Sequence, residues 1–157
     1  MKTATINTPL GNATLEGDEH GVQSFKLGGD LCTPEHLIPE ELKATITQLN
    51  EYFKGERREF TITLTPNGTP FQQKVWSLLQ QQPYGKTTSY LDLSKQLGEP
   101  KAIRAVANAN GKNPIWILIP CHRIIGSNGA LTGYAWGVGR KQWLLNHESP
   151  AKQQSLF

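Results

Sequence analysis

Apolar residues alternate with polar ones in three short runs near the start of the chain, and turn formers such as Gly11 and Gly21 lie between them. The apolar members of these runs are Ala4, Ile6, Ala13, Leu15, Val22, Phe25 and Leu27. A period of two residues is typical of strands that bury one face. The pattern therefore predicts a small antiparallel meander at the start of the chain.

After Pro39 the apolar spacing becomes that of a helix. Pro39 is a favoured first helical residue, and Gly55 ends the pattern. The apolar stripe of this helix consists of Leu42, Ile46, Leu49 and Phe53. A second alternation, from Phe60 to Leu64, predicts one more strand. None of these residues has a spacing typical of a catalytic site.

Turn formers dominate residues 65–70 (Thr-Pro-Asn-Gly-Thr-Pro), so we expect a boundary between a domain of residues 1–66 and one of residues 67–157. Thr69 and Gln72 have the spacing of a capping box, with Pro70 at the first helical position. This pattern predicts a helix over about residues 70–82.

Two shorter helices follow, separated only by Gly98 and Glu99. The first is expected from Ser89 to Leu97, with Thr87 or Thr88 as its cap, and the second from Pro100 to Asn110. So tight a turn between two helices is typical of a helix-turn-helix unit. In the second helix we expect Ile103, Val106 and Ala107 to face the core, and Ala102, Arg104, Ala105, Asn108 and Ala109 to face outward.

The outward face of that second helix has small side chains and one long cation, Arg104. Small side chains allow a helix to approach a nucleic-acid backbone closely, and Arg104, Lys101 and Lys112 could contact phosphates. An ordinary alanine-rich, solvent-exposed helix has the same composition. The helix alone therefore leaves both interpretations open.

The candidate chemistry follows the apolar run from Ile115 to Ile119, which predicts a buried strand or extended core segment, although so short a run does not exclude a helix. Pro120 ends the run. A thiol, an imidazole and a guanidinium come next, on Cys121, His122 and Arg123. Since a cysteine after an apolar run is commonly a small core residue, the pair of Cys121 and His122 needs a wider pattern to be interpreted as catalytic.

The composition narrows the classes of protein. The chain has 157 residues, of which 37% are hydrophobic, and a formal net charge of +3 that argues only weakly for an acidic partner. No segment is typical of a signal peptide or membrane span, so we expect a cytoplasmic protein whose two cysteines stay reduced. Cys32, His36 and His20 lack the paired spacing of a structural zinc site, so we expect no metal and interpret them as loop residues.

Several blocks in order resemble the O6-alkylguanine-DNA alkyltransferase family, also called methylated-DNA protein-cysteine methyltransferases, between about Phe71 and Glu148. The matching blocks are Arg104-Ala105-Val106, Asn113-Pro114, Ile119-Pro120-Cys121-His122-Arg123-Ile124, Gly133-Tyr134-Ala135, and Arg140-Lys141 through Trp143-Leu144-Leu145 to His147-Glu148. The resemblance implies an α+β fold. We expect a small N-terminal antiparallel-sheet domain with a helix, then a mainly helical, winged helix-turn-helix-like C-terminal domain.

The family's chemistry implies roles for five residues. Cys121 would accept the alkyl group after His122, acting through a water and held by Glu148, removes the thiol proton. Tyr90 would donate toward the departing base, and Asn113 would brace the segment near the cysteine. The product is a thioether, so each molecule should act once, without a cofactor.

Double-stranded DNA bearing O6-alkylguanine is the implied partner, because such a protein must flip the damaged base out of the duplex. Arg104, beside Ala105, would fill the gap from the minor groove, and Tyr134 would wall the base pocket. Backbone groups of Ile124 and Ala135 would bind the guanine edge. Further residues expected at the DNA or the base are Ser89, Asn108, Arg123, Gly133 and Trp136.

Two positions depart from the family pattern. Asn108 stands where many members have a small residue, and Trp136 where many have glycine. We expect the Trp136 indole to cover part of the pocket, so that methyl groups react better than benzyl groups.

The function expected from the resemblance is direct-reversal repair of O6-methylguanine, and also of O4-methylthymine, by single-turnover transfer to Cys121. Two alternatives are a binding module that recruits other repair proteins without transfer, and a cysteine hydrolase. Relatives of the first kind lack the cysteine that this chain keeps, and the second gives no reason for a helix-turn-helix.

The tail from about Ser149 is rich in glutamine, and we expect it to be mobile and the protein to be a monomer. Its last five residues resemble the short peptide by which bacterial repair proteins dock on the sliding clamp, with Gln154 where leucine is usual. The matching positions are Gln153, Ser155, Leu156 and Phe157. An end without a partner is the alternative.

Overall fold

The computed structural model describes residues 1–129 and 134–149 of the chain. The chain divides into two compact units, the first formed by Met1–Asn67 with Pro114–Trp116, and the second by Gly68–Asn113 with Ile117–Phe157. The predicted α+β class is confirmed, since a three-stranded antiparallel sheet comes first and a mainly helical region follows. Among the described residues, every helix is too short or too polar to cross a membrane.

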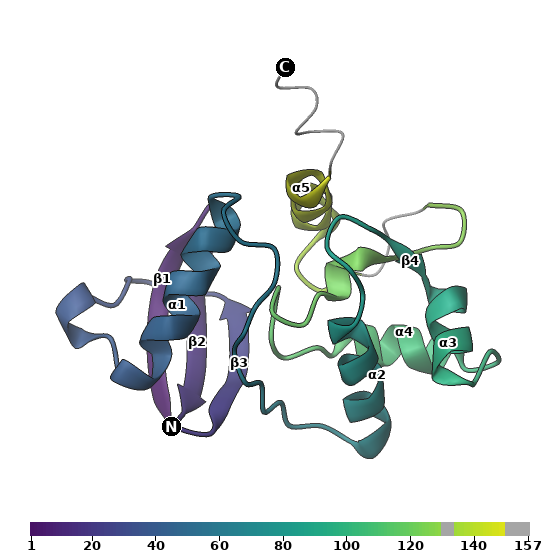
Figure 1. Cartoon of the computed structure of the whole chain (residues 1–157), viewed down its shortest axis with the longest axis horizontal. Helices are drawn as coiled ribbons and strands as arrows, with labels where there is room; N and C mark the ends of the chain where they lie inside the picture. The colour runs from purple at the N-terminus through teal and green to yellow at the C-terminus, as the bar shows by residue number, and fades with distance from the viewer. Residues whose placement is uncertain (130–133, 150–157) are drawn as a thin grey trace. The chain divides into compact units, whose positions relative to one another are not determined.

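The first unit is built on the predicted meander. β1 (Lys2–Thr8), β2 (Gly11–Asp18) and β3 (Gly21–Leu27) pair in that order, so that Ala4 faces Leu15 across the first ladder. α1 (Glu40–Phe53) lies across one face of the sheet (Figure 1), after a short 3-10 helix, η1 (Glu35–Leu37). The helix and sheet bury Leu42 and Leu49 completely, as the apolar periodicities require.

The predicted strand from Phe60 to Leu64 does not form. Only Leu64 makes a bridge, to Val22, and the amide of Thr61 instead donates to the side-chain oxygen of Gln48 on α1 at 2.9 Å. Phe60 packs its ring against Tyr52, with centroids 5.5 Å apart. The alternation therefore reflects side-chain packing, while the backbone bonds to β3 only at Val22.

The apolar run from Ile115 to Ile119 is buried as predicted, but it is not a strand. Ile115 alone bridges to Phe25 in the first unit, and the chain then enters the second unit at Ile117. Ile117 has a φ of 69°, which a β-branched residue rarely adopts. This left-handed residue interrupts the extended backbone just before Pro120.

In the second unit, α2 (Pro70–Gln80) begins with the predicted capping box, in which Thr69 and Gln72 each bond the other's backbone. α3 (Tyr90–Leu97) ends at Gly98, whose φ of 86° permits the tight turn toward α4 (Ile103–Gly111). The remaining elements are β4 (Thr88–Ser89), η2 (Cys121–Arg123), β5 (Ile124–Ile125) and α5 (Val138–Glu148).

Details of the two central helices differ from the prediction. Ser89, rather than Thr87 or Thr88, caps α3, its hydroxyl oxygen accepting from the Asp92 amide at 3.0 Å. α4 starts three residues later than expected.

The inner face of α4 is also rotated from the expected one. It consists of Val106, Ala109 and Asn110, while Ile103 is 37% exposed. The Trp76 indole on α2 donates to the Ala109 carbonyl at 2.8 Å, which draws that end of α4 inward.

A two-residue parallel pairing positions the reactive segment. Thr88 of β4 pairs with Ile124 of β5, and Ser89 pairs with Ile125. Because α3 starts directly after β4 and β5 follows directly after η2, this pairing fixes the beginning of α3 beside the segment that carries Cys121.

Candidate active site

Cys121 lies at the start of η2 and is only 2% exposed. Two asparagine amides hold the backbone around it. Asn113 donates to the Ile119 carbonyl at 2.7 Å, and Asn110 donates to the Cys121 carbonyl at 3.4 Å. The thiol is thus carried by a turn fixed on both sides, which limits its conformational freedom.

His122 follows on the same turn and is completely buried. Its Nε2 lies 2.8 Å from Oε2 of Glu148, the last residue of α5, and its Nδ1 has no hydrogen-bond partner among the described residues. A carboxylate only accepts hydrogen bonds, so Nε2 carries the proton in the neutral imidazole. The lone pair is then on Nδ1, which can receive a proton.

Arg123 does not have the position expected of a DNA-binding residue. The residue is 6% exposed, and Nε and Nη2 donate to the two carboxylate oxygens of Glu148 at 2.8 and 3.0 Å. Nη1 donates to the Gln82 carbonyl at 2.7 Å. Because the guanidinium is buried in this ion pair, it is not available to a phosphate, and the expectation for Arg123 is corrected.

Burial also sets the protonation states of the site. It lowers the pKa of His122, which Glu148 partly opposes. Burial of Glu148 favours its protonated form, but His122 and Arg123 outweigh this effect and hold its pKa well below the usual range. We therefore assign a neutral imidazole beside an ionised carboxylate whose charge Arg123 balances.

Burial raises the pKa of the Cys121 thiol to about 11, although Asn113, Lys141 and Tyr134 each favour the thiolate. At pH 7 such a thiol is ionised in roughly one molecule in ten thousand. A thiolate nucleophile at this position therefore needs a base that removes the proton during the reaction.

Lys141 belongs to the site, although the sequence did not single it out. It is completely buried on α5, and its ammonium group donates to the Ile124 carbonyl. The ammonium lies 5.9 Å from the ring centre of Tyr90 and 5.7 Å from that of Tyr134. Burial lowers its pKa, which a charge on Cys121 would raise. The i, i+3, i+7 spacing of Lys141, Leu144 and Glu148 was the available signal.

The tyrosine on α3 lies in the same region. Tyr90 is partly exposed, and burial, together with the charge of an ionised Cys121, raises its pKa, while Asn110 lowers it. Its hydroxyl is therefore a protonated donor at neutral pH. Ile124 is buried, and its carbonyl accepts from Lys141. A carbonyl oxygen has two lone pairs, so a contact from Ile124 to the guanine edge stays a prediction.

Of the remaining residues expected at the DNA or base, Tyr134 adjoins the buried group through Lys141, and the others lie outside it. Arg104, Ala105 and Asn108 are exposed on α4, and Ser89 caps α3. The Tyr134 and Trp136 rings meet edge to face with centroids 5.7 Å apart, and Ala135 between them is exposed. Gly133 lies outside the described residues, as do the four expected clamp-binding positions.

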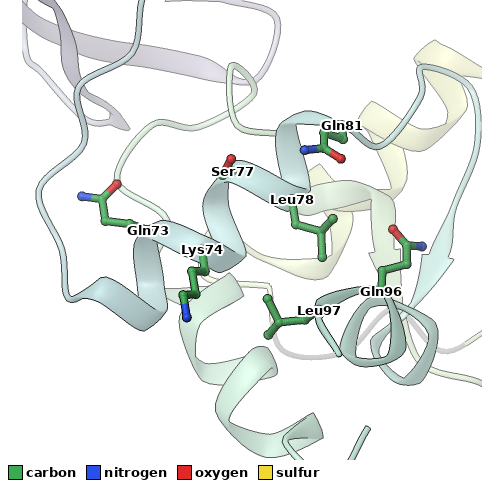
Figure 2. A pocket seen from close by; sticks show the side chains of 7 residues that line it. All are labelled: Gln73, Lys74, Ser77, Leu78, Gln81, Gln96 and Leu97. Atoms are coloured by element: carbon green, nitrogen blue, oxygen red, sulfur yellow. The ribbon is translucent and has the colours of Figure 1, made fainter. Parts of the chain in front are cut away.

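A separate surface groove of about 430 Å³ lies between α2 and α3 (Figure 2). Its lining consists of Gln73, Lys74, Ser77, Leu78 and Gln81 from α2, with Gln96 and Leu97 from α3. It has no thiol, imidazole or carboxylate, so the nucleophilic chemistry belongs to the Cys121 group. In the described part of the chain, His20, Cys32 and His36 do not form a metal-binding group.

Comparison with known proteins decides the family. Residues 70–150 match the model of the 6-O-methylguanine DNA methyltransferase, DNA binding domain, and residues 1–66 match its ribonuclease-like domain. The chain belongs to the 6-O-methylguanine DNA methyltransferase family. The resemblance inferred from the sequence is confirmed, and with it the expected activity, methyl transfer from DNA to a protein cysteine.

The match to this methyltransferase family extends over both units. A methylated-DNA–protein-cysteine methyltransferase of Methanosarcina acetivorans is 43% identical over 94% of this chain and 98% of its own length. The constitutive enzyme of Bacillus subtilis is 42% identical over 92% of this chain and 93% of its own length. The crystal structure of Mycobacterium tuberculosis OGT in complex with DNA has a TM-score of 0.84 and 42% identity, covering 96% of each chain.

Proposed function

We propose that this chain repairs DNA by direct reversal, taking the methyl group from O6 of a flipped guanine onto Sγ of Cys121. The S–C bond forms as the O6–C bond breaks, and the thiol proton passes to Nδ1 of His122, through a bridging water. Guanine leaves as an anion that a hydrogen bond from the Tyr90 hydroxyl stabilises, and it then takes up a proton from solvent while His122 returns its proton to solvent. The observation that supports this most directly is the buried Cys121 beside a neutral His122 held by Glu148.

DNA binding assigns roles to the exposed residues of α4. Arg104 would enter the space that the flipped base leaves, while the small side chain of Ala105 allows the helix to approach the minor groove. Tyr134 and Trp136 would form the wall of the base pocket. We extend the substrate to O4-methylthymine, which presents an alkyl ether of the same kind.

Intact-mass measurement of the whole protein tests the function. After incubation with a duplex that contains O6-methylguanine, one methyl group should be retained per molecule, and peptide mapping should place it on Cys121. Loss of the lesion without a mass change would indicate turnover by another chemistry. Tight binding with neither change would indicate the recruitment module.

Trp136→Gly is expected to increase the reaction rate with benzylguanine by roughly tenfold or more, because removing the indole opens the pocket to a bulky group. The rate with an O6-methylguanine duplex is the matched control and should change by less than about threefold. Labelling of Cys121 by the two alkyl donors, followed over time, gives both rates. Equal benzyl labelling of the two proteins would refute a covering role for Trp136.

Lys141→Met should slow methyl transfer at pH 7 by roughly 10- to 100-fold, because losing the ammonium raises the pKa of Cys121 by about one to two units. Unfolding free energy should change by no more than about 1 kcal/mol, since the variant also removes a costly buried charge. The folded pKa of Lys141 is lowered. The free energy of unfolding of the wild type should therefore increase as the pH rises from the folded-state pKa of Lys141 to its unfolded-state pKa. The variant should lack this increase.

The measurements for Lys141→Met are single-turnover transfer and urea unfolding at several pH values. Arg140→Met, on the exposed side of α5, is the control for changing a neighbouring cation. A parallel loss of stability and activity would mean that Lys141 only supports the fold.

We also propose that the protein acts in the cytoplasm, where its thiols would stay reduced, and that it is a monomer. The last five residues would dock on a bacterial sliding clamp. Deleting residues 153–157 should abolish clamp binding in surface plasmon resonance without changing methyl transfer. An unchanged affinity would leave the tail without this partner.

A further inference from the structure

Arg123 uses every hydrogen-bonding nitrogen of its guanidinium inside the protein. Two of them bind both oxygens of Glu148 and the third binds the Gln82 carbonyl, while the cation lies 5.6 Å from the ring centre of Tyr84. Oε2 of Glu148 is shared, since it accepts from Arg123 at 3.0 Å and lies 2.8 Å from Nε2 of His122. The carboxylate of Glu148 thus connects Arg123 to His122, the proposed base.

Stability alone gives little reason for this arrangement. A buried ion pair gains little over apolar side chains of similar size, because both charges lose their hydration. The Arg123–Glu148 pair is instead explained if the site needs an ionised Glu148 whose charge Arg123 balances.

The charge balance matters for the imidazole. Beside a carboxylate with no other partner, His122 would be stabilised as the imidazolium, whose Nδ1 cannot accept a proton. With Arg123 in place, the carboxylate keeps its charge, orients Nε2–H and has its field largely cancelled. The other charged groups near this pair are Lys141 on α5, whose charge acts on His122, and Lys86, exposed beside the recess at Glu148. The titratable neighbour of His122 on η2 is the Cys121 thiol.

We propose that Arg123 is a positioning residue for methyl transfer, which keeps Glu148 ionised and oriented while leaving His122 neutral, with Nδ1 ready for the proton of Cys121. This inference rests on the proposed function. It assigns to the third residue of Cys121-His122-Arg123 a role in setting the protonation state of the second.

The pH dependence of single-turnover methyl transfer, measured with the full chain and an O6-methylguanine duplex, tests the inference. Arg123→Met should move the midpoint of the acidic limb upward by about one to three pH units and lower the rate at pH 7 by roughly 10- to 100-fold. Arg123→Lys, which keeps a charge without the bidentate contact, should give a smaller upward shift. Arg58→Met, at an exposed arginine of the first unit, should leave the profile unchanged.

A double variant separates electrostatics from structure. Arg123→Met with Glu148→Gln removes both charges, so the acidic limb should return to the wild-type midpoint or below it, although the rate stays low. An unmoved limb in Arg123→Met, or a limb equally displaced in the double variant, would overturn the inference. If Arg123→Met does not fold, an unmoved limb in Arg123→Lys overturns it. Failure of the wild type to gain a methyl group would refute the proposed function instead.

Discussion

Cys121→Ala should repair no O6-methylguanine and gain no methyl group, whatever the incubation time. The reaction needs a soft, polarisable nucleophile whose bond to the alkyl carbon is permanent, and the variant has no atom that can take that part. The expected loss is complete, because in the proposed mechanism Cys121 is the methyl acceptor and water does not replace it. Intact mass and lesion content of the duplex, measured in the same samples, give the two readouts.

Cys32→Ala is the matched control for this variant. Cys32 is the only other cysteine of the chain and is exposed, with its Sγ 3.5 Å from the side-chain oxygen of Asn12. Its replacement should leave both the rate and the final methyl content unchanged. Lesion removal by Cys121→Ala would show that another residue, or water, receives the methyl group.

Much of the fold follows from local pattern. The alternation around Ala4, Leu15 and Phe25 and the helical stripe through Leu42 and Leu49 correspond to elements that form. The strand predicted between Phe60 and Leu64 fails because a partner distant in the sequence decides the backbone. Between residues 60 and 64 the apolar period was present, yet the Thr61 amide binds a side chain on α1. No local pattern contains that information.

The site shows the same division. Cys121 and His122 were evident from the sequence because their motif is contiguous. Arg123 and Lys141 were placed wrongly or missed because charged residues are usually exposed, and both are buried here by partners far along the chain. Arg123 meets Glu148 from 25 positions away, and Lys141 meets the Ile124 carbonyl from 17. Only the tertiary fold shows that these cations face the reactive segment.

His122→Gln is expected to slow methyl transfer at pH 7 by roughly 10²- to 10⁴-fold. The glutamine amide can still donate to Glu148, so the buried carboxylate keeps a partner and the fold should persist. What is lost is the acceptor for the thiol proton. Since the pKa of Cys121 is raised to about 11, the variant must wait for the small fraction of molecules that ionise without help.

The pH dependence of this variant has a definite sign. Its rate should rise about tenfold per pH unit between pH 7 and 10, because the thiolate fraction grows tenfold per unit below the thiol pKa. The wild type should be nearly flat above pH 6.5, since the lowered pKa of His122 keeps the base neutral there. The two rates should therefore converge as the pH approaches 11, while His20→Gln, at an exposed histidine, should follow the wild type throughout. A constant ratio across this range would mean that His122 positions the thiol but does not take its proton.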